Sequence, residues 1–443
     1  MSSELVTLHR FADLLSEPLR NGVYKPKEHH GRGIKIVNMG ELFGHPRLRN
    51  VSMKRLELTD VELRKASLKE NDLLFARRSL VAEGAGKCSI VKEIVEATTF
   101  ESSIIRARPN PGLVDSDYLY YFFASPQGRE LMGTILRQVA VSGITGGDLA
   151  ELKIPLPNLQ DQRMRASVLV AIDDRITLLR ETNTTLEAIA QALFKSWFVD
   201  FDPVRAKMEG RMPEGMDEAT AALFPDGFEV SELGLVPEGW TTSPIYDLAT
   251  FINGAAYKVF EPNAEQRGRP IIKIVELKSG ITSQTAYSDV EMPRKYLIET
   301  GDILFSWSGN PDTSIDTFVW TFEPAWLNQH IFRVLPHVDH ERTFVLQMLR
   351  HLKPVFTELA RNKQTTGLGH VTVADMKREL IAIPSGKLVE HFDLTIRPIH
   401  ARIFENQRQA QSLVTLRDTL LPRLISGQLR LPDAESQLAE ALS

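Results

Sequence analysis

The 443-residue chain contains the same sequence pattern twice, and this internal repeat restricts the folds it can adopt. Residues 99–106 (TFESSIIR) match residues 326–333 (WLNQHIFR) in hydrophobic pattern, 227 positions further on. Three further pairs have the same shift of 227: Thr145 and Thr372, Asp148 and Asp375, and Pro157 and Pro384. Residues 70–75 match residues 300–305 at a shift of 230, and residues 34–37 match residues 272–275 at a shift of 238. Repetition at a nearly fixed period indicates a repeated structural unit, and small drifts are tolerated in surface loops. The sequence therefore predicts two copies of one domain.

Each copy shows a mixture of strand and helix patterns. Short apolar or β-branched runs bounded by Gly, Asn and Asp predict strands at residues 72–76, 90–95 and 303–306. Helical patterns follow at residues 117–123, 129–136 and 343–361, and a short strand ending in proline closes each copy at residues 152–157 and 380–384. Both halves are therefore predicted to be α+β domains.

A helix with a heptad pattern follows each proline strand. The first seam contains Leu169, Ile172, Ile176, Leu179, Asn183, Leu186, Ala190, Leu193 and Trp197. The second keeps the same register with Ile396, Ile399, Ile403, Asn406, Ala410, Leu413, Arg417, Leu420 and Leu424. Such a seam can pack on its own domain, but a narrow, sustained stripe with one asparagine in each copy favours pairing of the two helices. We predict an intramolecular antiparallel coiled coil, in which a pseudo-twofold axis relates the two domain–helix units.

Pro398 lies within the second heptad pattern. Proline inside a helix removes a hydrogen bond and clashes with the preceding turn. We therefore expect the second helix to begin near Pro398, with Phe392 outside the seam.

These patterns divide the chain into six segments. The predicted boundaries are a first domain at residues 1–160, the first long helix at 161–200, a proline-rich connector at 201–241, a second domain at 242–390, the second long helix at 391–430 and a loosely held acidic tail at 431–443.

Composition and missing motifs exclude several classes of protein. The only cysteine, Cys88, excludes an intramolecular disulfide, and no apolar run is long enough to span a membrane, so we expect a cytoplasmic protein. The net charge of −5 differs from that of a simple basic nucleic-acid binder. The sequence has no P-loop, no CxxC and no HExxH motif. We therefore expect no metal site, no cofactor of its own and no catalytic activity in the isolated chain.

Several runs resemble type I restriction–modification specificity subunits. They are residues 154–162 (IPLPNLQDQ), 171–176 (AIDDRI), 186–204 (LEAIAQALFKSWFVDFDPV), 232–240 (ELGLVPEGW), 327–333 (LNQHIFR) and 416–427 (LRDTLLPRLISG). The resemblance implies that the two domains are target-recognition domains that read a bipartite double-stranded DNA target. It also implies that the seam helices dock two methyltransferase (M) subunits, joined by restriction (R) subunits in a host-defence complex. S-adenosylmethionine, ATP and magnesium would then bind to the partners. The alternatives are a single-chain DNA methyltransferase or nuclease, and a non-catalytic coiled-coil scaffold.

Two regions of each copy are candidate DNA-contacting segments. The residues after the first apolar strand differ between the copies, ARRS at 76–79 against SWSG at 306–309, and arginine can read guanine through two hydrogen bonds. The small and hydroxyl residues at 141–148 and 364–372 would let backbone N–H groups approach phosphates. Solvated loops or structural turns explain both regions equally well. The candidate residues are Arg77, Arg78, Lys87, Thr145, Ser306, Trp307, Ser308, Asn310 and Thr372.

Overall fold

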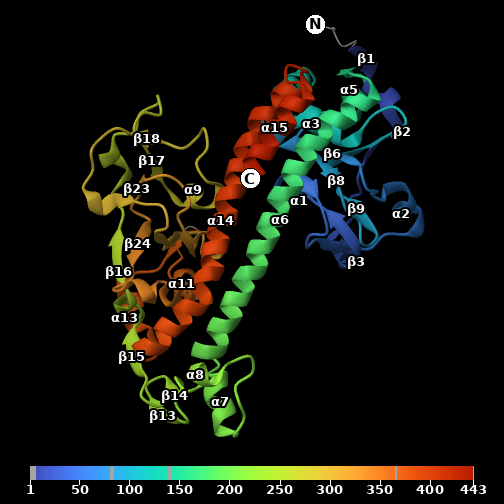
Figure 1. Ribbon diagram of the computed structural model, residues 1–443. Coiled ribbons are helices and arrows are strands. Elements are labelled where there is room, and N and C mark those ends of the chain that lie inside the picture. Colours follow the sequence, from blue (N-terminus) through green and yellow to red (C-terminus); the bar gives the residue numbers. More distant parts are fainter. Residues whose placement is uncertain (1–5, 80–83, 138–141, 365–366, 443) are drawn as a thin grey trace. The chain divides into compact units, whose positions relative to one another are not determined.

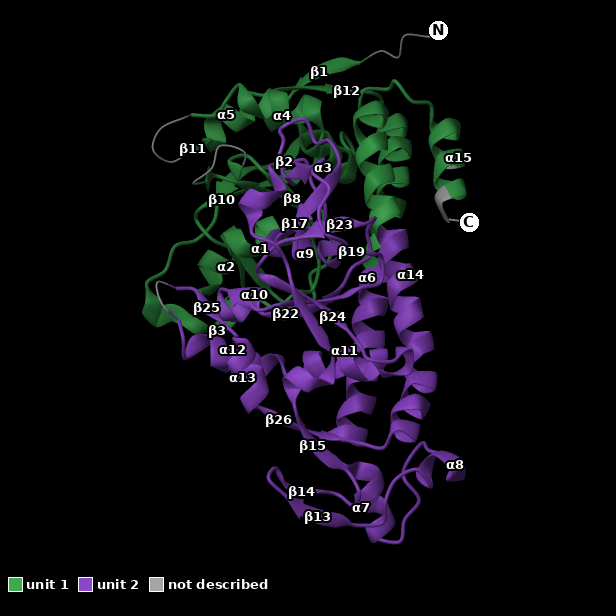
Figure 2. Cartoon of the chain, turned by 90° about the vertical axis from the view of Figure 1, so that its left-hand side faces the viewer, with its two compact units in different colours: residues 1–177, 411–443 green, residues 178–410 purple. Residues whose placement is uncertain are grey.

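The computed structural model describes residues 6–79, 84–137, 142–364 and 367–442. The chain divides into two compact units, coloured differently in Figure 2. Unit 1 contains residues 1–177 and 411–443, and unit 2 contains residues 178–410. Each unit combines one globular domain with segments of two 40-residue helices, α6 (Leu159–Phe198) and α14 (Gly386–Ile425).

The globular domain of unit 1 contains two main sheets (Figure 1). The larger one has the order β2-β10-β6-β8-β4, formed by β2 (Leu15–Asn21), β10 (Ile104–Pro109), β6 (Leu73–Ala76), β8 (Cys88–Val91) and β4 (Arg47–Leu48). The smaller one has the order β5-β3-β9, formed by β5 (Lys54–Leu56), β3 (His30–Val37) and β9 (Thr98–Phe100). Strand β1 (Thr7–Arg10) pairs with the predicted proline strand, β12 (Lys153–Leu156). The short helices are α1 (Met39–Gly44), α2 (Asp60–Ala66), α3 (Ser116–Ala124), α4 (Pro126–Gly133) and α5 (Gly146–Ala150).

Unit 2 repeats this arrangement. One sheet has the order β16-β24-β20-β22, formed by β16 (Thr250–Asn253), β24 (Ile331–Leu335), β20 (Ile303–Ser306) and β22 (Asp316–Val319). The other has the order β18-β17-β23-β19, formed by β18 (Tyr287–Ser288), β17 (Arg269–Ile272), β23 (Ala325–Leu327) and β19 (Leu297–Ile298). Strand β15 (Thr241–Pro244) pairs with the second proline strand, β26 (Leu380–Ile383). The short helices are α9 (Ile274–Ser279), α10 (Pro311–Ser314), α11 (Arg342–His351), α12 (Lys353–Arg361) and α13 (Val373–Arg378).

The two domains therefore have the same fold, as the internal repeat predicts. In both domains, a buried four-residue strand (β6 or β20) pairs with a strand that begins within the repeated segment 99–106 or 326–333 (β10 or β24). A parallel pair recurs as well, β3 with β9 and β17 with β23. The predicted α+β class, the strands at 72–76 and 303–306 and the two closing strands are confirmed, whereas the strand predicted at 90–95 is β8, which ends at Val91.

One part of the predicted alignment is wrong. The expected match of residues 34–37 with 272–275 requires a shift of 238, whereas the structure gives 235. Asn38 and Lys273 each precede a short helix, and their backbone N–H groups donate to Glu41 and Glu276 at 2.8 and 3.0 Å. The repeated Ile-Lys-Ile-Val letters produced the error, because the same residues end a strand in one copy and begin a helix in the other.

The long helices pair in antiparallel fashion within each unit. In unit 1, Arg165 of α6 donates to the carbonyl of Leu424 of α14 at 3.2 Å. In unit 2, the rings of Phe194 and Phe392 lie 5.9 Å apart. Residue numbers rise along one helix as they fall along the other, so the predicted antiparallel pairing is confirmed.

Most of the predicted seam is buried, although Leu186 and Leu193 are half-buried, and its two asparagines meet. Seam residues with at most 7% exposure include Leu169, Ile172, Ile176, Leu179, Ile403, Leu413 and Leu420. Asn406 donates to Asn183 Oδ1 at 2.8 Å, and Asn183 donates to the carbonyl of Ile403 at 3.1 Å. A paired amide inside an apolar seam fixes the register, because a shift of either helix would leave it without a partner.

The expected start of the second helix is wrong. Helix α14 begins at Gly386, well before Pro398, and Phe392 is fully buried against Phe194, Trp197 and Phe198 of α6. Pro398 lies on an exposed face, as does Leu394, one turn earlier. The free energy gained by burying apolar residues in the turns of α14 before Pro398 is larger than the cost of the hydrogen bond that the proline cannot form.

The connector and the tail are also more ordered than expected. Residues 201–241 contain α7 (Asp202–Met208), α8 (Glu218–Ala221) and a hairpin of β13 (Phe228–Ser231) and β14 (Gly234–Pro237). Val204, Phe224 and Trp240 pack into the core of unit 2, which explains why the segment is not a loose linker. The tail forms α15 (Leu431–Leu442), in which Ala434 is fully buried. No helix within the described residues has the length and apolar composition of a membrane span.

The asparagine pair gives a stability prediction. Replacing Asn406 by Ala removes the donor to Asn183 and should lower the free energy of unfolding by about 1–3 kcal/mol. Replacing both, as N183L/N406L, should cost less or stabilise the fold, because no amide then stays unpaired. Urea denaturation followed by circular dichroism measures both effects.

The matched control is Ser412→Ala, at an exposed position of the same helix. It should change the free energy of unfolding by at most about 0.5 kcal/mol. A double variant less stable than N406A would show that the amide pair itself stabilises the seam.

Candidate nucleic-acid interface

A short two-stranded ladder in each unit brings the two candidate segments together. In unit 1, β7 (Arg78–Ser79) pairs with β11 (Ser142–Gly143). In unit 2, β21 (Ser308–Gly309) pairs with β25 (Gly369–His370). Equivalent backbone hydrogen bonds extend both ladders, since Ile144 N–H donates to the carbonyl of Arg77 at 3.0 Å and Val371 N–H to that of Trp307 at 2.8 Å. Val141, Thr365 and Thr366, which the predicted segments include, lie outside the described residues.

In unit 1 the ladder exposes one arginine. Arg78 is exposed, whereas Arg77 is half-buried and its Nη1 lies 3.5 Å from the carbonyl of Ser102. Lys87 is half-buried over the ring of Phe43, with its Nζ 5.3 Å from the ring centroid. Burial, with a smaller contribution from Arg129, lowers the pKa of Lys87. Of the three predicted cations, Arg78 is therefore the one whose side chain is freely presented to solvent.

The equivalent ladder in unit 2 presents an aromatic residue instead. Trp307 Nε1 donates to Asn253 Oδ1 at 3.1 Å, and its ring lies 5.6 Å from His330 and 5.8 Å from Phe332. Burial lowers the pKa of His330, which keeps the imidazole beside the tryptophan neutral at pH 7. Ser308 in β21 is half-buried. The indole is thus held in a fixed orientation at the start of the ladder.

Two other predicted residues in unit 2 have structural positions. Ser306 is fully buried at the end of β20, so a ligand cannot reach it without rearrangement of the sheet. Asn310 is exposed but caps α10, where its Oδ1 accepts from the N–H groups of Asp312 and Thr313 at 3.0 and 3.2 Å.

Thr145 and Thr372 are both helix caps. Thr145 accepts from the N–H of Asp148 at 3.1 Å at the start of α5, and Thr372 accepts from the N–H of Asp375 at 3.2 Å at the start of α13. Each hydroxyl also donates to the same aspartate, at 2.8 and 2.6 Å. Burial of Asp375 opposes its ionisation, but hydrogen bonds from Lys363 and Thr372 lower its pKa to about 2. These contacts favour the structural-turn interpretation over phosphate binding.

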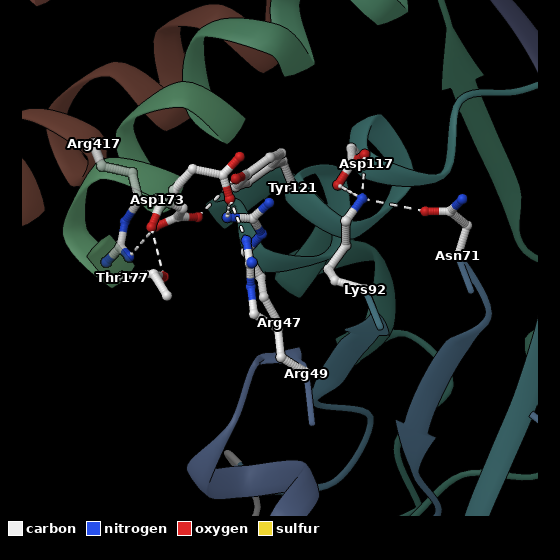
Figure 3. A network of polar contacts seen from close by, with 10 residues as sticks. Arg47, Arg49, Asn71, Lys92, Asp117, Tyr121, Asp173, Thr177 and Arg417 are labelled. Carbon is white, nitrogen blue, oxygen red and sulfur yellow. Dashed lines mark hydrogen bonds and ion pairs between the residues drawn. The ribbon is translucent and has the colours of Figure 1, made fainter. Parts of the chain in front are cut away.

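A polar network in unit 1 ties the globular domain to both long helices (Figure 3). Asp173 of α6 accepts from the hydroxyl of Tyr121 in α3 at 2.7 Å and from Arg417 Nη1 of α14 at 2.8 Å. The adjacent Asp174 accepts from Arg47 in β4 at 2.9 Å. Burial, reinforced by Asp173, raises the pKa of Tyr121, so its hydroxyl remains a donor. Sequence reasoning missed this network, although a charged residue at the seam position of Arg417 was a signal for it.

In unit 2, different side chains connect the globular domain to the two long helices. Gln347 of α11 donates to Glu187 of α6 at 3.1 Å and lies 2.8 Å from Nε2 of His400 of α14. Arg350 also bonds to Glu187. Burial lowers the pKa of His400 to about 4, so this imidazole is neutral at pH 7. Both units therefore attach their domain to the helix pair through polar side chains at matching positions.

The fold and the two ladders define a class of protein with two similar domains, each packed on an antiparallel helix pair and each presenting a different surface. The chain belongs to the family described as the type I restriction modification DNA specificity domain, which it matches over residues 30–188 and 237–388. Among the described residues no three His, Cys, Asp or Glu side chains gather as a metal site would require.

Relatives and a solved structure agree with this assignment. The chain is 24% identical to the type I restriction enzyme MjaIX specificity subunit of Methanocaldococcus jannaschii, over 92% of this chain and 90% of the relative. It is 25% identical to the HindI specificity subunit of Haemophilus influenzae, over 82% of this chain and 88% of the relative. The crystal structure of the type I restriction-modification S subunit from M. genitalium has the same fold, with a TM-score of 0.53 and 16% identity over 96% of this chain and 97% of that one.

The threonine caps give a second prediction. Thr145→Ala and Thr372→Ala should each lower the free energy of unfolding by about 0.5–2 kcal/mol, because a capping hydroxyl is lost. Thr→Ser at the same positions keeps the hydroxyl and should retain most of the stability. A Thr372→Ala protein of unchanged stability that binds all DNA sequences more weakly would instead support a phosphate contact.

Proposed function

We propose that the chain is the DNA-specificity subunit of a type I restriction–modification complex, and that each of its domains reads one half of a bipartite double-stranded target. One observation carries the proposal: the repeat keeps its scaffold but changes the side chains at equivalent ladder positions. Arg77 and Arg78 in one copy correspond to Trp307 and Ser308 in the other. Guanidinium, indole and hydroxyl groups offer a DNA groove different donors and packing surfaces. A generic coiled-coil scaffold would not require this difference.

The paired helices would dock the methyltransferase subunits, which in turn would bring in the restriction subunits. The seam side chains are buried within the chain, so a partner would contact the outward faces of the helices. On α6 these faces carry two exposed apolar residues, Leu178 and Ile189. They lie 11 residues apart, about three helical turns, so both are on the same face of α6.

Catalysis in this proposal belongs to the partners. The methyltransferase subunits would bind S-adenosylmethionine, and the restriction subunits would use ATP and magnesium, while this chain contributes sequence recognition. The names of its relatives, which describe specificity subunits, support this division of labour. The lack of P-loop, CxxC and HExxH motifs in the sequence agrees with it.

The proposal predicts a methylation pattern. Cells that express the chain with its methyltransferase partner should methylate adenine within one two-part DNA motif. Deleting the chain should abolish this methylation and leave other modified motifs unchanged. Sequencing of modified bases across the genome makes the measurement. Continued methylation of the motif without the chain, or methylation by the chain alone, would contradict the proposal.

The ladders predict a more specific effect. Arg78 and Ser308 occupy equivalent strand positions, so the variants R78S and S308R exchange their side chains without altering a glycine turn. If these side chains face the bases, R78S should alter the recognised sequence in one half of the motif and S308R in the other. Unchanged motifs in both variants would remove the ladders from the recognition surface. Ser167→Arg, at an exposed position of α6, controls for the added charge.

A further inference from the structure

Both domains carry an exposed arginine in the same unusual turn. Arg32 in unit 1 lies between Gly31 and Gly33, whose φ angles are 96° and 91°. Arg267 in unit 2 lies between Gln266 and Gly268, whose φ angles are 55° and 83°. The shift between the two arginines is 235, the same as that of the helix starts at Asn38 and Lys273. Left-handed backbone on both sides of one residue is uncommon, and in Gln266 it occurs without the freedom of glycine.

The turn makes the same close backbone approach in each copy. A Cβ on Gly33 would lie 2.5 Å from the carbonyl oxygen of Leu56, and one on Gly268 would lie 2.1 Å from that of Ser288. In unit 1 the turn interrupts the pairing of β3 with β5 much as a bulge does, because His30 and Ile34 both pair with Leu56. A bulge redirects the side chain that it carries and is often found beside functional sites.

A carboxylate from the neighbouring segment holds each arginine. Nε and Nη2 of Arg32 bond to the two oxygens of Glu57 at 2.6 and 3.1 Å, and Nε of Arg267 bonds to Asp289 at 3.0 Å. Glu57 and Asp289 directly follow the two residues that the turn glycines approach. The pKa of each carboxyl group is lowered by its arginine. The side chains of Arg32 and Arg267 nevertheless remain 72% and 60% exposed.

The pairing leaves one edge of each guanidinium free of this carboxylate. In both copies the acid bonds to Nε, and in unit 1 it also bonds to Nη2, which leaves Nη1 and the second N–H of Nη2 free of this acid. In unit 2 an exposed neighbour, Glu265, also reaches Nη1 at 3.2 Å. A guanidinium held on one edge loses little further freedom when the other edge binds a ligand.

The backbone of each turn is also fixed, by different side chains. In unit 1, Arg55 donates to the carbonyl of Gly33 at 2.7 Å. In unit 2, Asn263 accepts from the N–H of Arg267 at 2.8 Å and donates to its carbonyl at 3.0 Å. The two copies thus fix the same left-handed turn with unrelated residues, which indicates that the turn itself is what both domains require.

We propose that Arg32 and Arg267 are equivalent base-reading residues, one in each domain, and that each presents its terminal edge to a guanine. This inference rests on the proposed function. A guanine offers the O6 and N7 acceptors that match two guanidinium N–H groups. A phosphate is a poorer ligand, because the paired carboxylate cancels the charge that attracts it and repels the DNA backbone nearby. Glu57 and Asp289 are positioning residues that orient the arginines.

The test uses the complex reconstituted with its methyltransferase partners and duplexes that carry the genomic motif or single-base changes in it. R32Q should reduce discrimination at one guanine of one half-site by roughly five- to a hundredfold. R267Q should do the same in the other half-site only. Glu57→Gln should weaken discrimination at the base affected by R32Q. Methylation rates on each duplex make the measurement.

Two controls separate reading from stability. Arg211, which is exposed and paired with Glu209, lies outside both turns, so R211Q should leave every rate unchanged. The melting temperatures of R32Q and R267Q should stay within about 2 °C of the unmodified protein, because exposed ion pairs contribute little to stability.

Three results would overturn the assignment: unchanged discrimination, an equal loss on all duplexes, or both variants acting on the same half-site. If the unmodified complex methylates no two-part motif, the proposed function fails. If it does so and the variants leave discrimination intact, only the assignment of Arg32 and Arg267 fails.

Discussion

The structure depends on the antiparallel pairing of α6 and α14 within each unit. Neither domain packs only on the helix that follows it, since each unit combines a domain with segments of both helices. The pairing is specified by apolar seam residues such as Leu169 and Leu413 and by the amide pair of Asn183 and Asn406. Two sets of polar contacts, here called joints, attach the domains to the helices, one around Asp173 in unit 1 and one around His400 in unit 2. A register shift would separate the asparagines and misplace both joints. The register of the helices therefore determines how each domain is held in its own unit.

The two joints show how a duplicated scaffold can diverge without losing its architecture. Tyr121, Asp173 and Arg417 in unit 1 are replaced by Gln347 and His400, with Glu187, in unit 2. Both sets of contacts contain an ion pair, Asp173 with Arg417 in unit 1 and Glu187 with Arg350 in unit 2, and unit 2 adds a neutral imidazole. The same freedom applies to the ladders, where the hydrogen-bonding pattern recurs and the side chains differ. Divergence of side chains on a conserved hydrogen-bonding pattern agrees with the proposal that the two domains read unlike half-sites.

The sequence predicts the repeated α+β domains, the proline strands and the helix pairing because each follows from periodicity or spacing. Predictions from the sequence are wrong where tertiary packing overrides a local preference. Pro398 predicts a helix start, but burial of Phe392 extends the helix towards its N-terminus. Thr145 and Thr372 resemble phosphate-binding residues, yet their hydroxyls cap helices. Pairing of the two candidate segments in each ladder joins residues at least 60 positions apart in the chain, which no local pattern reveals.

Comparing the sequences of the two copies does not reveal that Arg32 and Arg267 are equivalent, because the alignment by matching letters has the wrong shift. The letters Ile-Lys-Ile-Val align the copies at a shift of 238, which places Arg267 opposite His29 and Arg32 opposite Pro270. Strand pairing and helix starts give 235, and only then do the two arginines, their left-handed turns and their carboxylates coincide. In a duplicated protein whose surfaces have diverged, equivalent functional residues are therefore defined by backbone geometry. A residue type that recurs in the same backbone turn, beside a carboxylate and held by unrelated neighbours, is stronger evidence of a shared role than a matching letter.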